Sequence, residues 1–558
     1  MSKFFKRSFL AYPIFPYFLV GIFATVLACE YDSLRQYWQI FAWGCVGFVI
    51  VDFTISLFLY CGFSFACIRI VQRFVRIFAF MLFCICLFFL RVDENKYPDF
   101  PPTETELSGE ILEYSCSAKG SAYGVLKINE SKLEFLKDNE VWFTFANHKR
   151  GQQYILPVLK RGDIIKVFCV IRSIKENPPS TWGYVKDKNA QRSFDKYLLS
   201  RFIYFKMFAN VGDVSVIDVA KSSSFGENIA KFVKGKLSKT CFLNAENLAY
   251  TGALKAMILG DKSNLTSEQK QIFKNTGTMH VFAVSGLHVG IIALLLFYIC
   301  SVACVPMYLR SFIVIPLLFL YVLACGLPAS AVRAFIMVAT FVLALSFSRG
   351  SRPINALMVS AVIAILVSPK VIFSAGFQLS YAVVGSLLLY SSVFVKLQQN
   401  FSAKIYDVKF AKFFNLLFKF FVGGLCVSIG ACCVALPITA YWFGSFSISG
   451  IFVSPIFVLL ASVAVATGII GAILPSVVGG IFNDIAILSV KYMSLLAEFV
   501  SDNFPMLLHV DINNGYFVCI IVGGILLLAS LVENVNVLLR FILVPLVSGL
   551  IMFFIWIL

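Results

Sequence analysis

Long apolar stretches dominate the pattern of hydrophobic and polar residues and recur along most of the chain. Residues 9–28, 38–60 and 74–90 are mostly apolar with few charges, and similar stretches follow Met279. A helix needs about 20 such residues to cross the hydrocarbon core of a bilayer. The pattern therefore predicts three N-terminal transmembrane helices and about eight more after Met279.

Composition gives the same class of protein. The chain is 59% hydrophobic and only 14% charged, with a mean hydropathy of +0.85. A soluble domain of this composition lacks the polar surface needed to cover its core. We predict a polytopic α-helical membrane protein with about 10 to 12 transmembrane helices.

Residues 97–221 interrupt the apolar pattern with a different period. Short runs rich in β-branched and aromatic residues alternate with Gly, Asn and Pro, which is typical of strands joined by turns. The predicted strands are Glu106–Cys116, Tyr123–Leu136, Glu140–Phe145, Asp163–Ile174 and Tyr204–Val219. Strands of this number and length suit an inserted small β-barrel that is OB-like, although other small β domains remain open. Its aromatic residues either form the core or present a surface on which bases stack.

Net charge does not by itself indicate a nucleic-acid ligand. The chain carries a formal charge of +17, but most of the excess lies in short connections between predicted helices, where the positive-inside rule expects it on the cytoplasmic face. These groups are Lys3/Lys6/Arg7, Arg69/Arg73/Arg76, Arg310, Arg349/Arg352 and Lys396/Lys404/Lys409/Lys412/Lys419. They predict a cytoplasmic N-terminus and an extracytoplasmic β domain, provided that residues 313–345 cross the membrane twice.

The predicted organisation thus has four parts. Residues 1–96 form three transmembrane helices, 97–221 the OB-like domain, 222–278 an amphipathic helical connector and 279–558 a transmembrane channel domain. The connector carries Lys231, Lys234, Lys236 and Lys239 at helical spacing. This pattern fits a helix that faces a membrane surface or phosphate, and equally a solvated helix face.

Cysteine usage adds one open question. Most of the 16 cysteines lie in predicted spans, where Cys behaves as a small apolar residue, and zinc-type spacing is absent. Cys116 and Cys169 are the pair in the β domain. An oxidising compartment permits a disulfide between them, and two free buried thiols are the alternative.

The run from Asn275 to Gly290 places polar residues at the start of an apolar span. It reads Asn-Thr-Gly-Thr-Met-His280-Val-Phe-Ala-Val-Ser285-Gly286-Leu-His288-Val-Gly290. Polar groups at this depth are costly unless they line an aqueous path or bond to neighbouring helices. Metal binding is disfavoured because His280 and His288 lie about 80° apart around a helix axis with no third ligand nearby. Nucleophilic catalysis by Ser285 with a histidine remains a third interpretation.

This run resembles the core of the ComEC family, the competence proteins that pass DNA across the inner membrane of bacteria. Other family elements occur in order: GLPASAVRAFIM (326–337), SAGFQLSYAVVGSL (374–387) and LPITAYWFGSFSISG (436–450). Asn177-Pro178 and Phe194-Asp195-Lys196-Tyr197-Leu198 resemble the end of the family's soluble domain. The likeness covers about residues 97–474. The metal-binding β-lactamase-like domain with which relatives commonly end has no counterpart here, since only His509 follows His288.

The resemblance implies a channel and implicates Asp261, His280, Ser285, Gly286, His288, Arg333 and Gln378. Arg333 stands out, because an arginine in an apolar segment usually faces a cavity or an anion, although snorkelling to the interface is the alternative. The resemblance implies an inner-membrane channel for single-stranded DNA without enzymatic activity, cofactor or metal. Its expected partners are the bilayer, DNA-receptor and helicase-type competence proteins, and a second copy of the chain. A secondary transporter for a smaller anionic solute is the main alternative.

Overall fold

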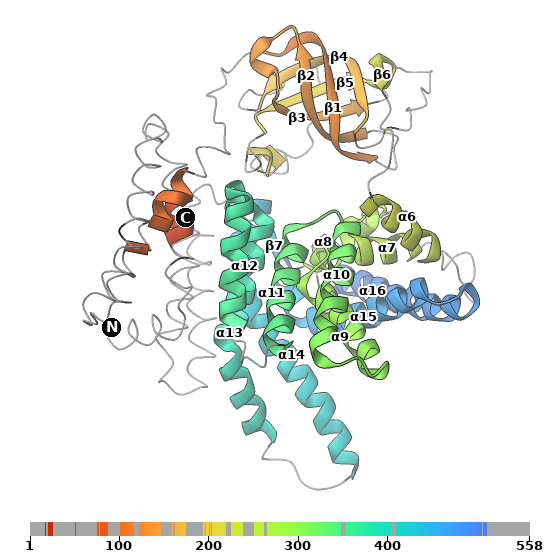
Figure 1. Ribbon diagram of the computed structural model, residues 1–558. Coiled ribbons are helices and arrows are strands. Elements are labelled where there is room, and N and C mark those ends of the chain that lie inside the picture. The colour runs from red at the N-terminus through yellow and green to blue at the C-terminus, as the bar shows by residue number, and fades with distance from the viewer. Residues whose placement is uncertain are drawn as a thin grey trace.

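The computed structural model describes the β domain and most of the helical region that follows it (Figure 1). The described residues are 101–116, 122–146, 162–174, 203–218, 225–237, 250–261, 265–346, 353–402, 409–504 and 506–509, with shorter pieces at 17, 20–25, 51, 75–76, 79–86, 159, 194–195, 197–199 and 201. The predicted spans at 9–28, 38–60 and 74–90 therefore lie largely outside the described residues.

The β domain is a closed five-stranded barrel with one additional strand. Its strands are β1 (Thr103–Cys116), β2 (Ala122–Ser131), β3 (Glu140–Ala146), β4 (Ile164–Ser173), β5 (Phe205–Asn210) and β6 (Val214–Asp218). Strands β1, β2 and β3 form an antiparallel meander, β5 joins β3 in parallel, and β4 pairs with both β5 and β1. The predicted OB-like barrel is thus confirmed. The fifth predicted strand divides into β5 and β6 around a short 3-10 turn, and β6 pairs with β4 beyond β5.

Alternation along the strands explains the barrel core. On β3, Val141, Phe143 and Phe145 are fully buried, whereas Trp142 between them points outward and is half-buried. The rings of Phe143 and Phe145 stack with centroids 4.6 Å apart. On β2, a Cβ on Gly124 would lie 1.9 Å from the carbonyl oxygen of Glu113, so only glycine permits β1 and β2 to approach this closely.

The two cysteines of the β domain lie at different positions along the barrel. Cys169 of β4 lies opposite Thr105, near the start of β1, whereas Cys116 ends that strand opposite Ala122. Ten residues of β1 lie between Thr105 and Cys116. The Cys169 thiol is free and contacts the carbonyl oxygen of Thr105 at 3.6 Å. The free-thiol alternative thus holds for Cys169, whereas the side chain of Cys116 lies outside the described residues.

Three helices form the connector to the membrane region. They are α6 (Phe225–Leu237), α7 (Thr251–Leu259) and α8 (Ser267–Asn275). Thr266 and Gln269 form a capping box that starts α8, and Gly260 in the left-handed conformation ends α7. Helix α7 is almost entirely buried, because it packs against α15 and α16 in one apolar core. Lys231 of α6 is exposed, and so are Phe225 and Phe232, so the outer face of this helix is mixed in character.

Eight helices follow and make up the described membrane region. They are α9 (Gly286–Val302), α10 (Met307–Ala324), α11 (Ala329–Ser346), α12 (Pro353–Val367), α13 (Ala375–Ser402), α14 (Lys409–Phe443), α15 (Ser449–Ile473) and α16 (Ser476–Asn503). Residues 307–324, 423–443, 449–473 and 477–503 are long and apolar enough to cross a membrane, and α9, α11, α12 and the first part of α13 are shorter apolar helices. The predicted polytopic helical class is confirmed.

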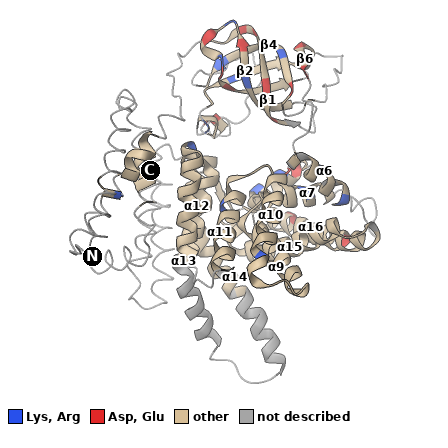
Figure 2. Cartoon of the chain, in the orientation of Figure 1, with Lys and Arg blue, Asp and Glu red and all other residues tan. Residues whose placement is uncertain are grey.

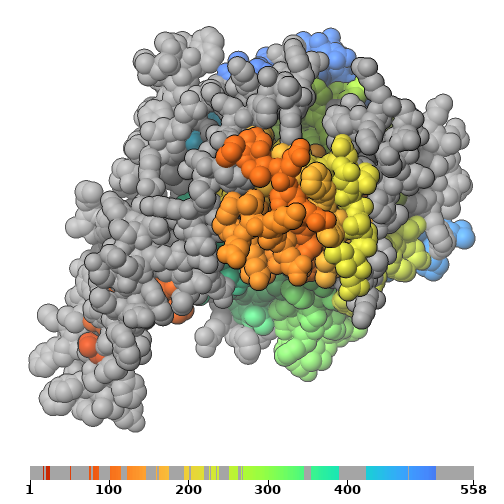
Figure 3. All heavy atoms as spheres, turned by 90° about the horizontal axis from the view of Figure 1, so that it is seen from above, coloured from red at the N-terminus to blue at the C-terminus, as the bar shows by residue number. Residues whose placement is uncertain are grey.

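The β domain lies beyond one end of α12 and covers part of the helical region (Figures 1 and 3). The hairpin formed by α13 and α14 extends toward the opposite end of the molecule (Figure 1). Among the residues coloured in Figure 2, charged positions gather on the β domain and near helix ends, and few fall in the middle of the membrane helices. The few polar groups that do lie between these helices form the candidate site.

Candidate anion site

The first component of the site is the N-terminus of α9. Ser285 has an extended conformation and precedes the first helical residue, Gly286, where the apolar run begins. His288 on the first turn is only 2% exposed, and its ring Nδ1 accepts a hydrogen bond from the backbone N–H of Ser285 at 3.3 Å. This contact fixes the start of the helix. The first N–H groups of a helix have no intrahelical acceptor, so this end carries partial positive charge.

The second component is Arg333 on α11. Its side chain is 6% exposed, and its Nε has no hydrogen-bond partner. The Nη1 group lies 4.0 Å from the sulfur of Met337, and the guanidinium lies 5.7 Å from the ring centroid of Tyr381. Among the described residues, Arg333 makes no ion pair with a carboxylate. The snorkelling alternative does not fit a side chain buried to this degree.

Gly286 brings these two components together. A Cβ placed on Gly286 would lie 3.0 Å from Nη2 of Arg333 and 3.6 Å from Ala334. The absence of a side chain therefore lets the guanidinium approach the first turn of α9. Ser330, one turn earlier on α11, donates a hydrogen bond to the carbonyl oxygen of Val284 at 2.7 Å and fixes the two helices against each other.

The electrostatics of this arrangement favour an anion. A buried guanidinium costs several kcal/mol of desolvation, whereas a desolvated cation–π contact returns about 2 kcal/mol. The helix N-terminus adds a second positive source next to the first. An anion placed here would accept hydrogen bonds from Arg333 and from backbone N–H groups of α9, as phosphates do at helix N-termini.

Gln378 lies on the same helix as Tyr381, three residues earlier, and ties three segments together. Its Nε2 donates to the carbonyl oxygen of Ile372 at 3.1 Å, and its Oε1 accepts from the indole N–H of Trp442 at 2.9 Å. These bonds use the amide within the protein. The structure therefore places Gln378 as a group that orients α13 beside Arg333.

Asp261 and His280 lie toward the edge of the site. A Cβ placed on Gly260, the residue before Asp261, would lie 3.3 Å from the Val284 side chain. The turn that ends α7 therefore lies next to the residues that precede α9. His280 is exposed, and its Nδ1 is 3.1 Å from the carbonyl oxygen of Gly277. Of the predicted residues, Ser285, Gly286, His288 and Arg333 come together at the site.

Tyr381 and Ser360, which the sequence analysis did not single out, complete the surroundings of Arg333. Tyr381 faces the guanidinium, and its hydroxyl donates to Ser360 at 3.1 Å, which in turn donates to the carbonyl oxygen of Leu357 at 2.7 Å. The tyrosine follows the G-F-Q-L-S element directly, and that position was the available signal. Within the described part of the chain, no three His, Cys, Asp or Glu side chains are grouped as metal ligands.

The fold and site define a polytopic membrane protein that combines an OB-like barrel with an anion-attracting position between its helices. A family model described as competence protein matches residues 257–536, half of the chain. The chain therefore belongs to the competence protein family.

One curated relative is ComE operon protein 3 of Bacillus subtilis (strain 168). It is 26% identical over 281 residues, which are 50% of this chain and 33% of the relative. The chain thus matches about a third of that protein's length. No solved structure matches the chain significantly.

Proposed function

We propose that the chain is a channel subunit that takes part in DNA uptake and moves single-stranded DNA across the bacterial inner membrane into the cytoplasm. The family match supports a role in competence. The observation that carries the physical argument is Arg333, a buried cation without a carboxylate partner among the described residues, beside a helix N-terminus. A DNA strand presents one phosphate per nucleotide, so each passing phosphate would meet this position in turn.

The topology of the proposed channel follows from its basic loops. Positive residues around the α13–α14 connection belong on the cytoplasmic face, and the β domain lies toward the other end of the helices (Figure 1). The N-terminus is then cytoplasmic and the barrel extracytoplasmic. The barrel would receive the strand from a DNA-receptor protein, and a cytoplasmic helicase-type protein would supply the driving force.

A secondary transporter for a smaller anionic solute is the second candidate function. Several transporters bind an anionic substrate near the middle of the membrane at the N-terminus of a helix. The N-terminus of α9, with Arg333 beside it, has the same two features. Catalysis by Ser285 has less support, because Nδ1 of His288 accepts from the serine backbone N–H and is thereby unavailable as a base.

Deletion in a transformable host separates these functions. The gene is removed, and surface-labelled DNA is followed into the protease-protected, nuclease-protected cytosolic fraction. We expect DNA to bind the cell but not to reach the cytosol, and plasmid-borne copies of the gene to restore entry. Unchanged entry of DNA, together with a loss of uptake of a small phosphate- or carboxylate-bearing solute, would establish the transporter instead.

A further inference from the structure

One row of outward-facing side chains crosses every strand of the barrel. Consecutive Cα partners in this row are Glu113 (β1), Val125 (β2), Trp142 (β3), Lys206 (β5) and Arg172 (β4). Their neighbours along the strands, such as Leu126, point into the barrel core. The row therefore sets the ring of Trp142 on β3 next to two cations, Lys206 on β5 and Arg172 on β4. OB-folds bind oligonucleotides on the face of strands 2 and 3, with help from the β4–β5 loop.

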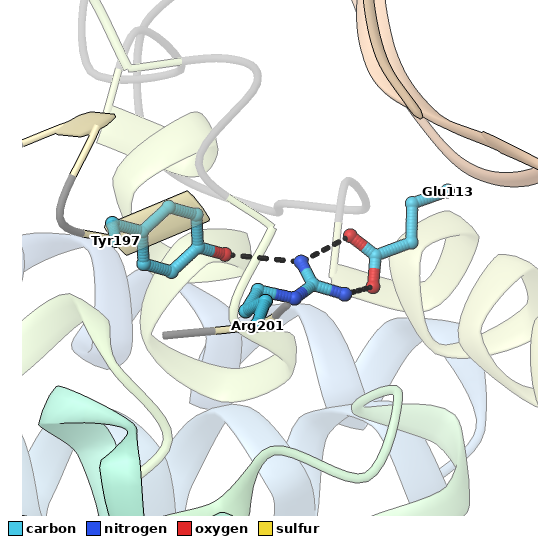
Figure 4. Close-up of polar contacts among 3 residues, drawn as sticks. All are labelled: Glu113, Tyr197 and Arg201. Carbon is cyan, nitrogen blue, oxygen red and sulfur yellow. Dashed lines mark hydrogen bonds and ion pairs between the residues drawn. The ribbon is translucent and has the colours of Figure 1, made fainter. Parts of the chain in front are cut away.

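The chain covers this row with part of its own β4–β5 connection. We call the described residues of this connection, 194, 195, 197–199, 201 and 203, the strap. At one end, Arg201 donates to both carboxylate oxygens of Glu113, at 2.9 and 2.6 Å, and to the hydroxyl of Tyr197 at 3.1 Å (Figure 4). In the middle, the fully buried Leu198 joins Val125 in a small apolar cluster outside the barrel.

The other end of the strap presents a ring and a carboxylate. Phe194 meets Trp142 edge to face with centroids 5.1 Å apart, and Asp195 pairs with Lys206. Lys206 also lies 5.2 Å from the Phe194 ring centroid. Burial lowers the pKa of Lys206, and the hydrogen bond to Asp195 opposes that shift. The dipeptide thus offers Trp142 an aromatic ring and Lys206 an anion.

These are the two groups by which a nucleotide is recognised: a base that stacks on an aromatic side chain and a phosphate that pairs with a cation. We propose that the row from Val125 to Arg172 is a binding site for single-stranded DNA, and that the strap occupies it as an intramolecular mimic of a nucleotide. DNA binds when the strap lifts. This inference takes its ligand, single-stranded DNA, from the proposed function. It adds the place on the barrel where the DNA binds and the segment of the chain that competes with the DNA.

The contacts of the strap are consistent with such competition. The Glu113–Arg201 pair is substantially exposed, with 51% and 28% of the side chains accessible, and exposed pairs contribute little to stability. Tyr197 is 39% exposed. An arriving strand replaces the Phe194 ring with a base and the Asp195 carboxylate with a phosphate, so Trp142 and Lys206 keep partners in both states.

A charge reversal at the exposed end of the strap gives a sharp test. The full chain is placed in lipid nanodiscs, and binding of a fluorescent oligothymidine is measured by anisotropy. R201E turns the pair with Glu113 into a repulsion and loosens the strap. We expect about fivefold tighter binding, although the variant loses a positive charge, and we expect the swapped pair E113R/R201E to return to the wild-type affinity. If Arg201 instead contacts DNA directly, R201E binds more weakly, which would overturn the proposal.

Two further variants keep the test decisive. Trp142→Ala in the R201E background must abolish the gain, because the stacking platform is gone; an unchanged gain contradicts the site. Phe194→Ala removes the mimic ring without changing charge and must also tighten binding, so a failure of R201E to fold leaves the test intact. The wild-type Arg333 is present in every variant. Loss of DNA entry in cells therefore tests the membrane site, and the affinity series tests the strap.

Discussion

Two basic side chains of the β domain, Arg201 and Lys206, and one between the membrane helices, Arg333, have opposite surroundings. In the β domain, Arg201 is held by both oxygens of Glu113, and the buried Lys206 is paired with Asp195. The Glu113 contact raises the pKa of Arg201. Arg333 is buried to a similar degree as Lys206, yet its Nε lacks a hydrogen-bond partner, and its guanidinium lies beside the sulfur of Met337 and the ring of Tyr381.

This difference separates charges that have a partner within the chain from a charge that awaits one. A buried pair whose partners satisfy each other holds its own segment in place, whereas a buried charge without a counter-ion lowers stability and persists only where function requires it. Arg333 therefore has a cost that a passing or resident anion offsets. Removing each charge in turn should give opposite results in the two regions.

Arg333→Met should give the largest effect. The variant removes the cation that meets the phosphate, so we expect DNA entry to fall about 100-fold, as expected for the loss of a few kcal/mol of charged hydrogen bonding. Because an uncompensated buried charge disappears, the same variant should have a thermal unfolding temperature equal to or above that of the wild type. Transformation frequency measures the loss of DNA entry, and thermal unfolding in detergent measures the change in stability.

Arg310 provides the matched control for that variant. It lies on α10, its Nε donates to the carbonyl oxygen of Val305 at 2.9 Å, and its guanidinium is 5.2 Å from the Phe297 ring centroid. Arg310→Gln should leave DNA entry within about twofold of the wild type, because an arginine that is already hydrogen-bonded near an exposed helix end contributes little. An equal loss of DNA entry in the Arg333→Met and Arg310→Gln variants would contradict a specific role of Arg333.

Gly286→Ala should give a smaller loss, about tenfold in DNA entry. The new methyl group would lie 3.0 Å from Nη2 of Arg333 and must push the guanidinium away from the α9 N-terminus. Gly290→Ala on the same helix meets no atom within 4 Å and serves as the control. Because alanine favours helix more than glycine, a decrease seen only at position 286 isolates the position of the arginine.

Lys206→Met should act on stability. It leaves Asp195 without its cation in a partly buried place, so we expect the β domain to lose about 3 kcal/mol of unfolding free energy. Limited proteolysis of the full chain reports this loss at the barrel. A β domain that is stabilised by Lys206→Met would show that its cations are as uncompensated as Arg333, and the contrast between the regions would fail.

Cys169→Ser should give the smallest effect, with DNA entry unchanged and insensitive to reductants. Burial raises the pKa of this thiol to about 12, so it stays protonated in the folded domain at pH 8 and reacts with maleimide only after unfolding. An unfolded thiol ionises near pH 8.5. Its contribution to stability is therefore constant below that pH and falls as the pH rises toward 12. Cys304 is exposed and is expected to react in the native chain, so labelling is read at the Cys169 peptide, where rapid reaction of the native protein would contradict the buried, free thiol.

The sequence predicted the elements well and their contacts poorly. Apolar length marked the helices, and alternation marked the strands of the barrel, because both patterns are local. The division of residues 204–219 into β5 and β6 depends on pairing with β4, and the burial of α7 depends on α15 and α16, which lie far along the chain. Arg333 was identified as a costly charge, but the role of Gly286 beside it depends on how α9 packs on α11.

The same limit applies to the strap. The sequence marked Phe194, Asp195 and Tyr197 only through a family resemblance, and treated the aromatic residues of the β domain as either core or stacking surface. In the barrel, aromatic residues occupy both positions. Phe143 and Phe145 fill the core, whereas Trp142 faces outward and contacts Phe194. Such a division follows from strand pairing across the barrel, which a single sequence does not specify.

Crosslinking at Tyr381 during DNA uptake tests the central claim most directly. A photoreactive phenylalanine analogue replaces Tyr381, whose ring lies 5.7 Å from the Arg333 guanidinium, and in a second strain it replaces Tyr308, which is exposed on the outside of α10. Labelled DNA is added, and the cells are irradiated while uptake proceeds. We predict a DNA adduct at position 381 that disappears in the Arg333→Met background, and none at position 308. No adduct at 381 while DNA still enters the cytosol would contradict a DNA path past Arg333.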